Sequence, residues 1–329
     1  MVLARIQLAV ACVGRVGDGV ACDLQFRVPD PQNQHEQAQR IRLGCVSFLN
    51  AKPLIDGLDS HPLLDVSYAV PSALLERLEG GDVDAALCPV IDYQVSAEEL
   101  ELVPVGGIGC DGPTLTVRLF SKGPIGKIAS VAVDGDSHTS VSLMRVLLAE
   151  LHGIRPEVLG LNRSIGAGAE ANGERQAQIQ NETDALLLIG DKVVTGAPTE
   201  GDYPHQMDLG EAWKLLTDLP FVFATWMARR GAKLGEAPSI LDKQRRKNRR
   251  DIRGIVGRHA AGLGWPEDLA AVYLGELLRY GIGPRELEAI NRFWRLAERH
   301  GVISKRREMV IQAGFGGGSE ARGVTAETA

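Results

Sequence analysis

VSFLNAKPL, residues 46–54, begins like a buried strand and ends like the start of a helix. Phe48 and Leu49 belong to the apolar run, and Pro53 is typical of the first turn of a helix. Asn50 lies between the two, where an amide either caps the helix or contacts a ligand. Position alone favours the cap. Because ligands of open α/β sheets bind at the carboxyl ends of strands, Asn50 is also a candidate site residue.

Strand-like and helical segments alternate outward from this stretch. The strand candidates are RLGCVSFL, DVSYAV, DAALCPV, LELVPV, TLTVRLF, SVAVDG, DALLLIG and PFVFATWMA. Helical patterns begin near Pro53 and at Pro71, and another covers residues 140–153. This order predicts an α/β fold with a parallel sheet covered by helices on both faces. From Ser239 onward, apolar spacings of three and four predict a helical C-terminal region.

The length and composition indicate two lobes with ordinary globular cores. The chain has 329 residues, more than the roughly 100–200 of one domain. Hydrophobic residues make up 44% and charged residues 24%, which leaves ample apolar material for burial. The net charge of −6 argues against a dedicated nucleic-acid binder and leaves small anionic ligands open. No apolar run reaches the ~18 residues that a membrane span needs, so we expect no membrane partner.

The two ends of the chain differ from its middle. Residues 24–41 are polar and rich in Gln, and the tail is Gly-rich, so we expect a disordered leader at 1–41 and a disordered tail at 313–329. The apolar run 6–13 with Cys12 faintly resembles a lipoprotein signal, but it is short and charged residues follow closely. The five widely spaced cysteines form no CxxC pair, which favours reduced thiols and a cytoplasmic protein.

Two tempting motifs and one polar segment have simpler interpretations. Gly107, Gly109 and Gly112 match GxGxxG by their letters, but Pro113 and a strand-like run follow where a dinucleotide-binding motif requires a helix. The basic run KQRRKNRR, residues 243–250, is interpreted as a solvated helix face. Residues 164–181 contain few residues that could pack, which predicts a loop or loose helix without an assigned role.

Six stretches together resemble the chorismate dehydratases of menaquinone biosynthesis. They are CVSFLNAKPL (45–54), GDVDAALCPVIDY (81–93), GIGCDGPTLTVRLFSKGP (107–124), DSHTSVSLMRVLL (136–148), LLLIGD (186–191) and DLGEAWKLLTDLPFVFATW (208–226). The resemblance implies the two-lobed fold of type II periplasmic binding proteins in a cytosolic enzyme. Lobe one would comprise residues 42–120 and 221–312, and lobe two residues 121–220. The oligomeric state is left open.

The resemblance also implies the reaction. Family members remove water from chorismate to give 3-enolpyruvyloxybenzoate in the futalosine route, and they use no metal or organic cofactor. The reaction removes the hydrogen of the ether-bearing carbon and the neighbouring hydroxyl, and the product ring is aromatic. A carboxylate of the substrate is thought to take the proton. The main task of the site is therefore to hold the dianionic substrate in one conformer. It does not need to supply a strong base.

The catalytic asparagine of the family falls on Asn50, within FLNxxPL, a motif that also places Pro53 at the substrate. The catalytic hydroxyl follows the DGP motif and falls on Thr116, where serine is usual; the hydroxyl remains, with an added methyl group. His138 stands where arginine is common. If that arginine binds a carboxylate, a histidine that is mostly neutral near pH 7 would weaken the contact.

The other candidate residues for substrate binding have structural alternatives. Ser137, Thr139 and Ser140 start a predicted helix, where they could bind a carboxylate or simply cap the helix. Asp111 and Gly112 precede a proline, and Asp-Gly-Pro forms a turn by its own chemistry.

Asp191 follows a buried-looking strand, where it could line a cleft or cap the next segment.

Two other functions stay open at this point. The related enzyme that forms dihydroxynaphthoate from cyclic dehypoxanthinylfutalosine shares the fold, but its opening motif resembles SPCPNDTF, which this chain lacks. A solute-binding protein without catalytic activity would share the lobes and would need an export signal.

Overall fold

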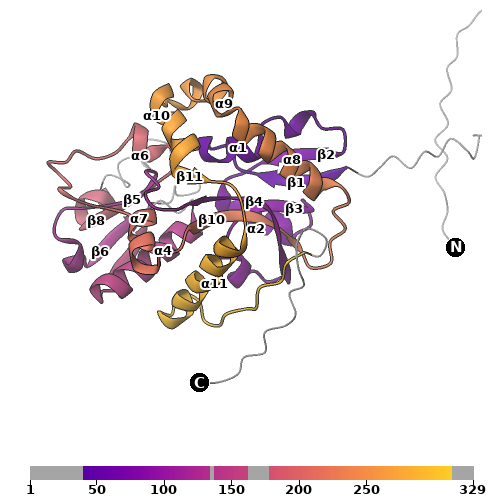
Figure 1. The fold of residues 1–329 in the computed structure, drawn as a ribbon. Coiled ribbons are helices and arrows are strands. Elements are labelled where there is room, and N and C mark those ends of the chain that lie inside the picture. The colour runs from indigo at the N-terminus through magenta and orange to yellow at the C-terminus, as the bar shows by residue number, and fades with distance from the viewer. Residues whose placement is uncertain (1–39, 134–136, 162–177, 313–329) are drawn as a thin grey trace, which may run out of the picture. The chain divides into compact units, whose positions relative to one another are not determined.

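The computed structural model of the chain describes residues 40–133, 137–161 and 178–312 (Figure 1). Cys12, Cys22, nearly all of the predicted leader, the predicted tail and residues 164–177 of the polar segment lie outside the described residues. The described chain from Arg40 onward belongs to one compact unit. Its first strand begins at Ile41, the last residue of the predicted leader.

The first sheet has six strands in the order β11-β4-β10-β3-β1-β2. Its strands are β1 (Ile41–Cys45), β2 (Leu64–Tyr68), β3 (Ala85–Pro89), β4 (Leu100–Cys110), β10 (Phe221–Arg229) and β11 (Leu278–Arg279). β1 is parallel to β2 and β3, whereas β10 is antiparallel to both β3 and β4.

The second sheet has five strands in the order β7-β6-β8-β5-β9. Its strands are β5 (Val117–Ser121), β6 (Ser130–Val133), β7 (Glu157–Gly160), β8 (Ala185–Ile189) and β9 (His205–Asp208). β6 is parallel to β7 and β8, and β5 is antiparallel to β8 and β9.

Helices occupy most of the connections and nearly all of the C-terminal region. They are α1 (Lys52–Ile55), α2 (Pro71–Glu79), α3 (Asp92–Val95), α4 (His138–His152), α6 (Lys192–Thr195), α7 (Leu209–Thr217), α8 (Ala237–Arg250), α9 (Ile252–His259), α10 (Glu267–Val272) and α11 (Pro284–Arg299). Short 3-10 turns are η2 (Leu49–Ala51), η3 (Leu58–Ser60), η4 (Ile125–Lys127) and η5 (Ala261–Leu263), and η6 (Tyr273–Leu277) is a π-helical turn. The predicted helical C-terminal region is confirmed, although η6 and β11 interrupt it.

The prediction of a parallel sheet was wrong, because both sheets are mixed. The chain leaves the first sheet after β4 and returns to it through β10, which inserts between β3 and β4 and runs antiparallel to both. β5 belongs to the second sheet, so the first crossing occupies residues 111–116 and precedes the expected boundary near Phe120. The limits of the two lobes as units stay a prediction.

The core explains most of the aromatic residues and thiols. Trp213, Trp226 and Trp294 are fully buried, as expected of core residues. Cys45, Cys88 and Cys110 are buried free thiols, and burial raises the pKa of each. These groups therefore behave as small apolar side chains.

The basic run is less exposed than expected, because α8 packs against β4 and α1. Arg245 Nε donates to the Val105 carbonyl at 2.8 Å, and Arg249 Nη1 donates to the Leu274 carbonyl at 3.0 Å. The prediction of a solvated face therefore holds for only part of the run.

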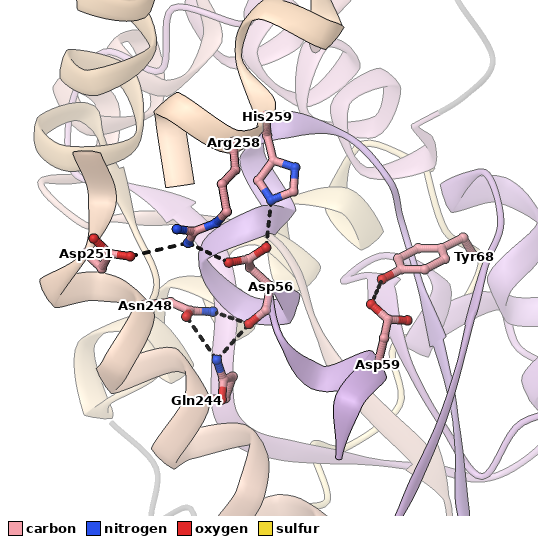
Figure 2. Close-up of polar contacts among 8 residues, drawn as sticks. All are labelled: Asp56, Asp59, Tyr68, Gln244, Asn248, Asp251, Arg258 and His259. Atoms are coloured by element: carbon pink, nitrogen blue, oxygen red, sulfur yellow. Dashed lines mark hydrogen bonds and ion pairs between the residues drawn. The ribbon is translucent and has the colours of Figure 1, made fainter. Parts of the chain in front are cut away.

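A polar cluster at the end of α1 joins this helix to α8 and α9, as Figure 2 shows. The Asp56 carbonyl accepts hydrogen bonds from Gln244 Nε2 at 2.7 Å and Asn248 Nδ2 at 2.9 Å. The Asp56 carboxylate accepts from Arg258 Nη2 at 2.7 Å and from His259 Nε2 at 2.6 Å. These bonds fix the segment that begins at Asn50.

Among the described helices, none is long and apolar enough to cross a membrane.

Candidate active site

A cavity of about 300 Å³ is lined by residues from both sheets and their connections. The lining residues are Val46, Phe48, Asn50, Pro71, Leu87, Pro89, Ile108, Thr114, Thr116, Val117, Ser137, Ser140, Ile189, Gly190, Asp191, Lys192, Phe223, Ala224, Tyr273 and Leu278. Most of this wall is apolar, and a few polar side chains converge on it, as in typical sites for small molecules. Among these residues, Asp191 and Lys192 carry the charged side chains.

Asn50 lies in the short turn η2, between the fully buried side chains of Leu49 and Ala51. The turn begins after Phe48 without a hydrogen bond from a capping side chain, and α1 likewise begins without one. Asn50 therefore does not cap α1, which was the structural alternative. Its Oδ1 is buried and has no hydrogen-bond partner. A buried acceptor without a partner is costly, and a ligand in the cavity could supply the missing donor.

The Thr116 hydroxyl lies 2.6 Å from the Tyr273 hydroxyl, and both residues are 1% exposed. Burial raises the pKa of Tyr273 well above its ordinary value, while hydrogen bonding by Thr116 and Asn50 opposes part of this rise. Tyr273 is therefore a neutral phenol that can donate or accept a hydrogen bond. It begins the π-helical turn η6, a type of turn that is frequent at functional sites.

Asp208 holds the crossing segment that leads to Thr116. Its carboxylate accepts from the Thr114 amide at 3.0 Å and from the Leu115 amide at 2.8 Å. The same carboxylate caps α7 by accepting from the amides of Gly210 and Glu211. Leu115 has φ of 66°, which is rare for a residue other than glycine. Anchoring by Asp208 thus maintains a strained backbone immediately before the candidate catalytic hydroxyl.

Asp191 is linked to the hydrogen-bonded pair of Thr116 and Tyr273 through Trp265. Trp265 Nε1 donates to Asp191 Oδ1 at 2.8 Å, and the indole stacks on the Tyr273 ring with centroids 4.8 Å apart. Burial raises the pKa of Asp191, although the bond from Trp265 opposes the rise. Of the two alternatives for Asp191, the structure shows the first: this residue lines the cavity, and its side chain forms no capping hydrogen bond to α6.

The start of α4 combines capping with the cavity wall. Ser137 Oγ accepts from the Ser140 amide at 3.4 Å, and both serines line the cavity. Thr139 is fully buried outside the lining, where its hydroxyl accepts from the Ile91 amide at 3.2 Å.

His138 also points elsewhere, since its Nδ1 lies 2.8 Å from Asp92 Oδ1. The hydrogen bond to Asp92 raises the pKa of His138, and burial raises the pKa of Asp92. The pair therefore joins α4 to α3, and His138 is not among the residues of the cavity wall.

Three other predicted binding residues do not line the cavity either. Pro53 is buried in α1. The Asp111 carboxylate lies 2.9 Å from Lys214 Nζ, and Gly112 adopts φ of 127° in the adjoining turn. Both belong to the segment that crosses between the sheets, so their role in the structure is to shape the approach to Thr116.

Sequence reasoning missed Tyr273, Trp265 and Lys192. Both aromatic residues lie in the C-terminal region, Tyr273 in the cavity wall and Trp265 stacked against Tyr273 outside the lining. The available signal was that the polar OH and N–H groups of buried aromatic residues need partners. Lys192 directly follows the LLLIGD stretch, and its position beside a predicted site residue was the available signal.

Comparisons with known proteins agree on the family and on the fold. The profile of a family described as menaquinone biosynthesis matches residues 41–299. The chorismate dehydratase of Thermus thermophilus is 30% identical over 243 residues, which cover 68% of this chain and 82% of that protein.

Two solved structures share the arrangement of the sheets. A protein from Archaeoglobus fulgidus has a TM-score of 0.57 at 15% identity and covers 82% of this chain and 100% of its own. The alkanesulfonate-binding protein from Xanthomonas axonopodis pv. citri, bound to MOPS, has a TM-score of 0.57 at 16% identity, with 83% and 96% covered. At these identities the likeness shows the fold alone, and it confirms the predicted periplasmic-binding-protein-like class.

Proposed function

Because the chain belongs to the menaquinone biosynthesis family, we propose that it is a chorismate dehydratase, a hydro-lyase that converts chorismate to 3-enolpyruvyloxybenzoate and water. The observation that carries this proposal is the buried Asn50 Oδ1 without a partner in a cavity that also contains the Thr116 hydroxyl. Chorismate offers a ring hydroxyl that can donate to this oxygen. The amide group of Asn50 can in turn donate to a substrate oxygen.

Thr116 and Tyr273 act as one hydrogen-bonding unit in this proposal. Their hydroxyls are 2.6 Å apart, so one donates to the other and the pair presents its remaining proton or lone pair to the cavity. Neutral donors at fixed positions stabilise negative charge that spreads into the ring as the proton leaves. The proton goes to a carboxylate of the substrate itself, the hydroxyl leaves from the neighbouring carbon, and the proton and the hydroxyl together form the water that is released.

Two groups are placed to bind the substrate as a dianion. Lys192 supplies a positive charge at the cavity wall, and Ser137 and Ser140 supply hydroxyl groups at the start of α4. Asp191 is negative when ionised and would repel a nearby carboxylate. Since burial raises its pKa, a bound dianion would raise the pKa further and favour the neutral carboxyl.

We also infer that the enzyme acts in the cytoplasm. The three described cysteines are free thiols, as is usual in a reducing compartment.

A solute-binding protein is the alternative that the fold favours, since the Xanthomonas structure binds its ligand in the same type of fold.

The experiment is to incubate the purified full chain with chorismate and to follow 3-enolpyruvyloxybenzoate by liquid chromatography and mass spectrometry. We expect loss of one water from chorismate with wild-type protein and none above background with Asn50→Ala. Tight chorismate binding without product would support the solute-binding alternative. Turnover of cyclic dehypoxanthinylfutalosine instead of chorismate would assign the chain to the dihydroxynaphthoate branch.

A further inference from the structure

A second cavity, of about 180 Å³, lies between the last turns of α4 and the end of α11. Its lining includes the guanidinium groups of Arg145 on α4 and Arg155 just before β7, and the imidazole of His300, the residue that follows α11. The remaining lining residues are Ala149, Pro156, Gly301 and Val302. The two cavities have no lining residue in common.

Arg145 and Arg155 are exposed arginines whose guanidinium groups have no hydrogen-bond or ion-pair partner among the described residues. Elsewhere guanidinium groups pair with carboxylates, as in Arg42 with Asp84 and Arg258 with Asp56. Other exposed arginines of the described residues, such as Arg295, also lack a partner. Arg145 and Arg155 are set apart because both line the same cavity.

The carboxylate beside this cavity is already paired. Glu150 Oε1 lies 2.5 Å from His300 Nε2 and 3.3 Å from Arg299 Nη1. The bond from His300 and the interactions with Arg299 lower the pKa of Glu150. The Glu150 carboxylate is thus bound by the side chains of Arg299 and His300 at the end of α11. It forms no ion pair with Arg145 or Arg155.

The terminal carbonyls of α4 and α11 weaken the positive potential here, because helix C-termini carry roughly half a negative charge. Two guanidinium groups outweigh this partial charge. Each presents a planar fork of N–H donors that matches the oxygens of a phosphate group. The volume of about 180 Å³ is below the roughly 300–1,000 Å³ of pockets for drug-sized ligands. It suits a compact oxyanion.

We propose that this second cavity is an anion site in which Arg145 and Arg155 bind a phosphate group, either as the inorganic ion or as the phosphate of a small ester. The site is independent of the chorismate cavity. Ser140 lines that cavity at the start of α4, whereas Arg145 lies 5 residues further on, roughly 7.5 Å along the helix axis, and the two cavities have no lining residue in common.

The test titrates the full chain with inorganic phosphate by calorimetry at constant ionic strength, with chloride as the competing salt. We expect saturable binding by the wild type and a loss of affinity of at least about tenfold in Arg145→Gln/Arg155→Gln. The lysine pair Arg145→Lys/Arg155→Lys keeps the charge but not the fork, so we expect it to bind with intermediate affinity. Titration with glycerol 3-phosphate distinguishes the ester from the ion.

Arg295→Gln is the matched control, because Arg295 is an exposed arginine of α11 outside the cavity lining. It should bind phosphate like the wild type. The proposal is overturned if the wild type shows no saturable binding, or if the Arg145→Gln/Arg155→Gln protein binds as tightly as the wild type. Loss of binding in Lys192→Met, with binding intact in the arginine variants, would assign the phosphate to the chorismate cavity and also refute it.

Discussion

Asn50 and Asp56 are six positions apart, yet the side-chain oxygen of Asn50 and the oxygens of Asp56 differ in whether they have hydrogen-bond partners. The carbonyl oxygen and both carboxylate oxygens of Asp56 accept hydrogen bonds from side chains on α8 or α9, with donor–acceptor distances of 2.6–2.9 Å (Figure 2). Asn50 Oδ1 is buried at the cavity and has none. A cluster in which all groups are satisfied stabilises the fold, whereas an unsatisfied buried group has a cost that a ligand in the cavity can relieve.

The comparison assigns different tasks to the two ends of one short segment. The Asp56 cluster holds α1 against the C-terminal helices, and this contact fixes the turn that carries Asn50. Variants at Asn50 should therefore change turnover with little effect on stability. Variants at Asp56 should change stability with little effect on turnover.

The largest effect is expected for Asn50→Ala, which removes both the unsatisfied oxygen and the amide donor. The rate of chorismate dehydration, kcat, should fall about 100-fold or more, as after removal of a donor that stabilises the transition state. The free energy of unfolding, measured with urea, should change by less than about 0.5 kcal/mol. A large loss of stability together with the loss of rate would show that Asn50 is a structural residue.

The second-largest effect is expected for Thr116→Val, with kcat about 50–100-fold lower, because this change removes the hydroxyl that forms a hydrogen bond with the Tyr273 hydroxyl. It also leaves the buried Tyr273 hydroxyl without this partner, at a cost of about 1–3 kcal/mol in stability. Adding Tyr273→Phe should recover much of that stability but not the rate. Thr116→Ser keeps the hydroxyl and should stay within a few-fold of wild-type kcat; inactivity of this variant would contradict the assigned role.

A smaller effect is expected for Lys192→Met, which removes the positive charge at the cavity wall. KM for chorismate should rise about tenfold, equivalent to about 1.4 kcal/mol, while kcat changes less. Lys192→Arg should retain most of the affinity. Lys247→Met is the control, since Lys247 is exposed on α8 outside the cavity lining; an equal rise in KM for both variants would exclude a specific contact.

Asp56→Asn should have the smallest effect on turnover and a measurable effect on stability, about 1–2 kcal/mol near neutral pH. Burial favours a higher pKa for Asp56, but the hydrogen bonds from His259 and Arg258 outweigh it and lower the pKa below 3.8. The carboxylate therefore stabilises the fold fully above that pH, and this contribution is lost as the pH falls through the lower folded-state pKa.

Urea unfolding of wild type and Asp56→Asn at pH 7 and near pH 3 checks this expectation. The two proteins should differ most at pH 7 and converge in acid. A constant difference at both pH values would show that the pKa of Asp56 is not lowered by folding.

The sequence predicted Asn50, Thr116, Asp191, Ser137 and Ser140, and all five line the cavity. Asp191 follows a strand and Ser137 and Ser140 begin a helix, and such positions are visible in the pattern of apolar residues. Thr116 was assigned through the resemblance to the family, and Asn50 through its position together with that resemblance. Pro53, Asp111, Gly112 and Thr139 were included by proximity to the same motifs. Only side-chain direction decides which neighbours face a cavity, and a motif does not specify it.

Tyr273, Trp265 and the antiparallel strand β10 were beyond the reach of local patterns. Tyr273 contacts Thr116 across 157 positions of sequence, and β10 lies between β3 and β4 although all strands of the second sheet come between β4 and β10 in the sequence. Long-range pairing of this kind depends on the whole topology. Apolar periodicity gives the type of an element and leaves its neighbours open.

The most direct test of the central claim is a crystal structure of the protein with 3-enolpyruvyloxybenzoate bound. We predict that the product occupies the cavity of about 300 Å³, with the Asn50 amide and the Thr116 hydroxyl within hydrogen-bond distance of its polar atoms. The carboxylate groups should lie toward Lys192 and the start of α4. A product bound elsewhere, or one in this cavity without a polar contact to Asn50, would contradict the account.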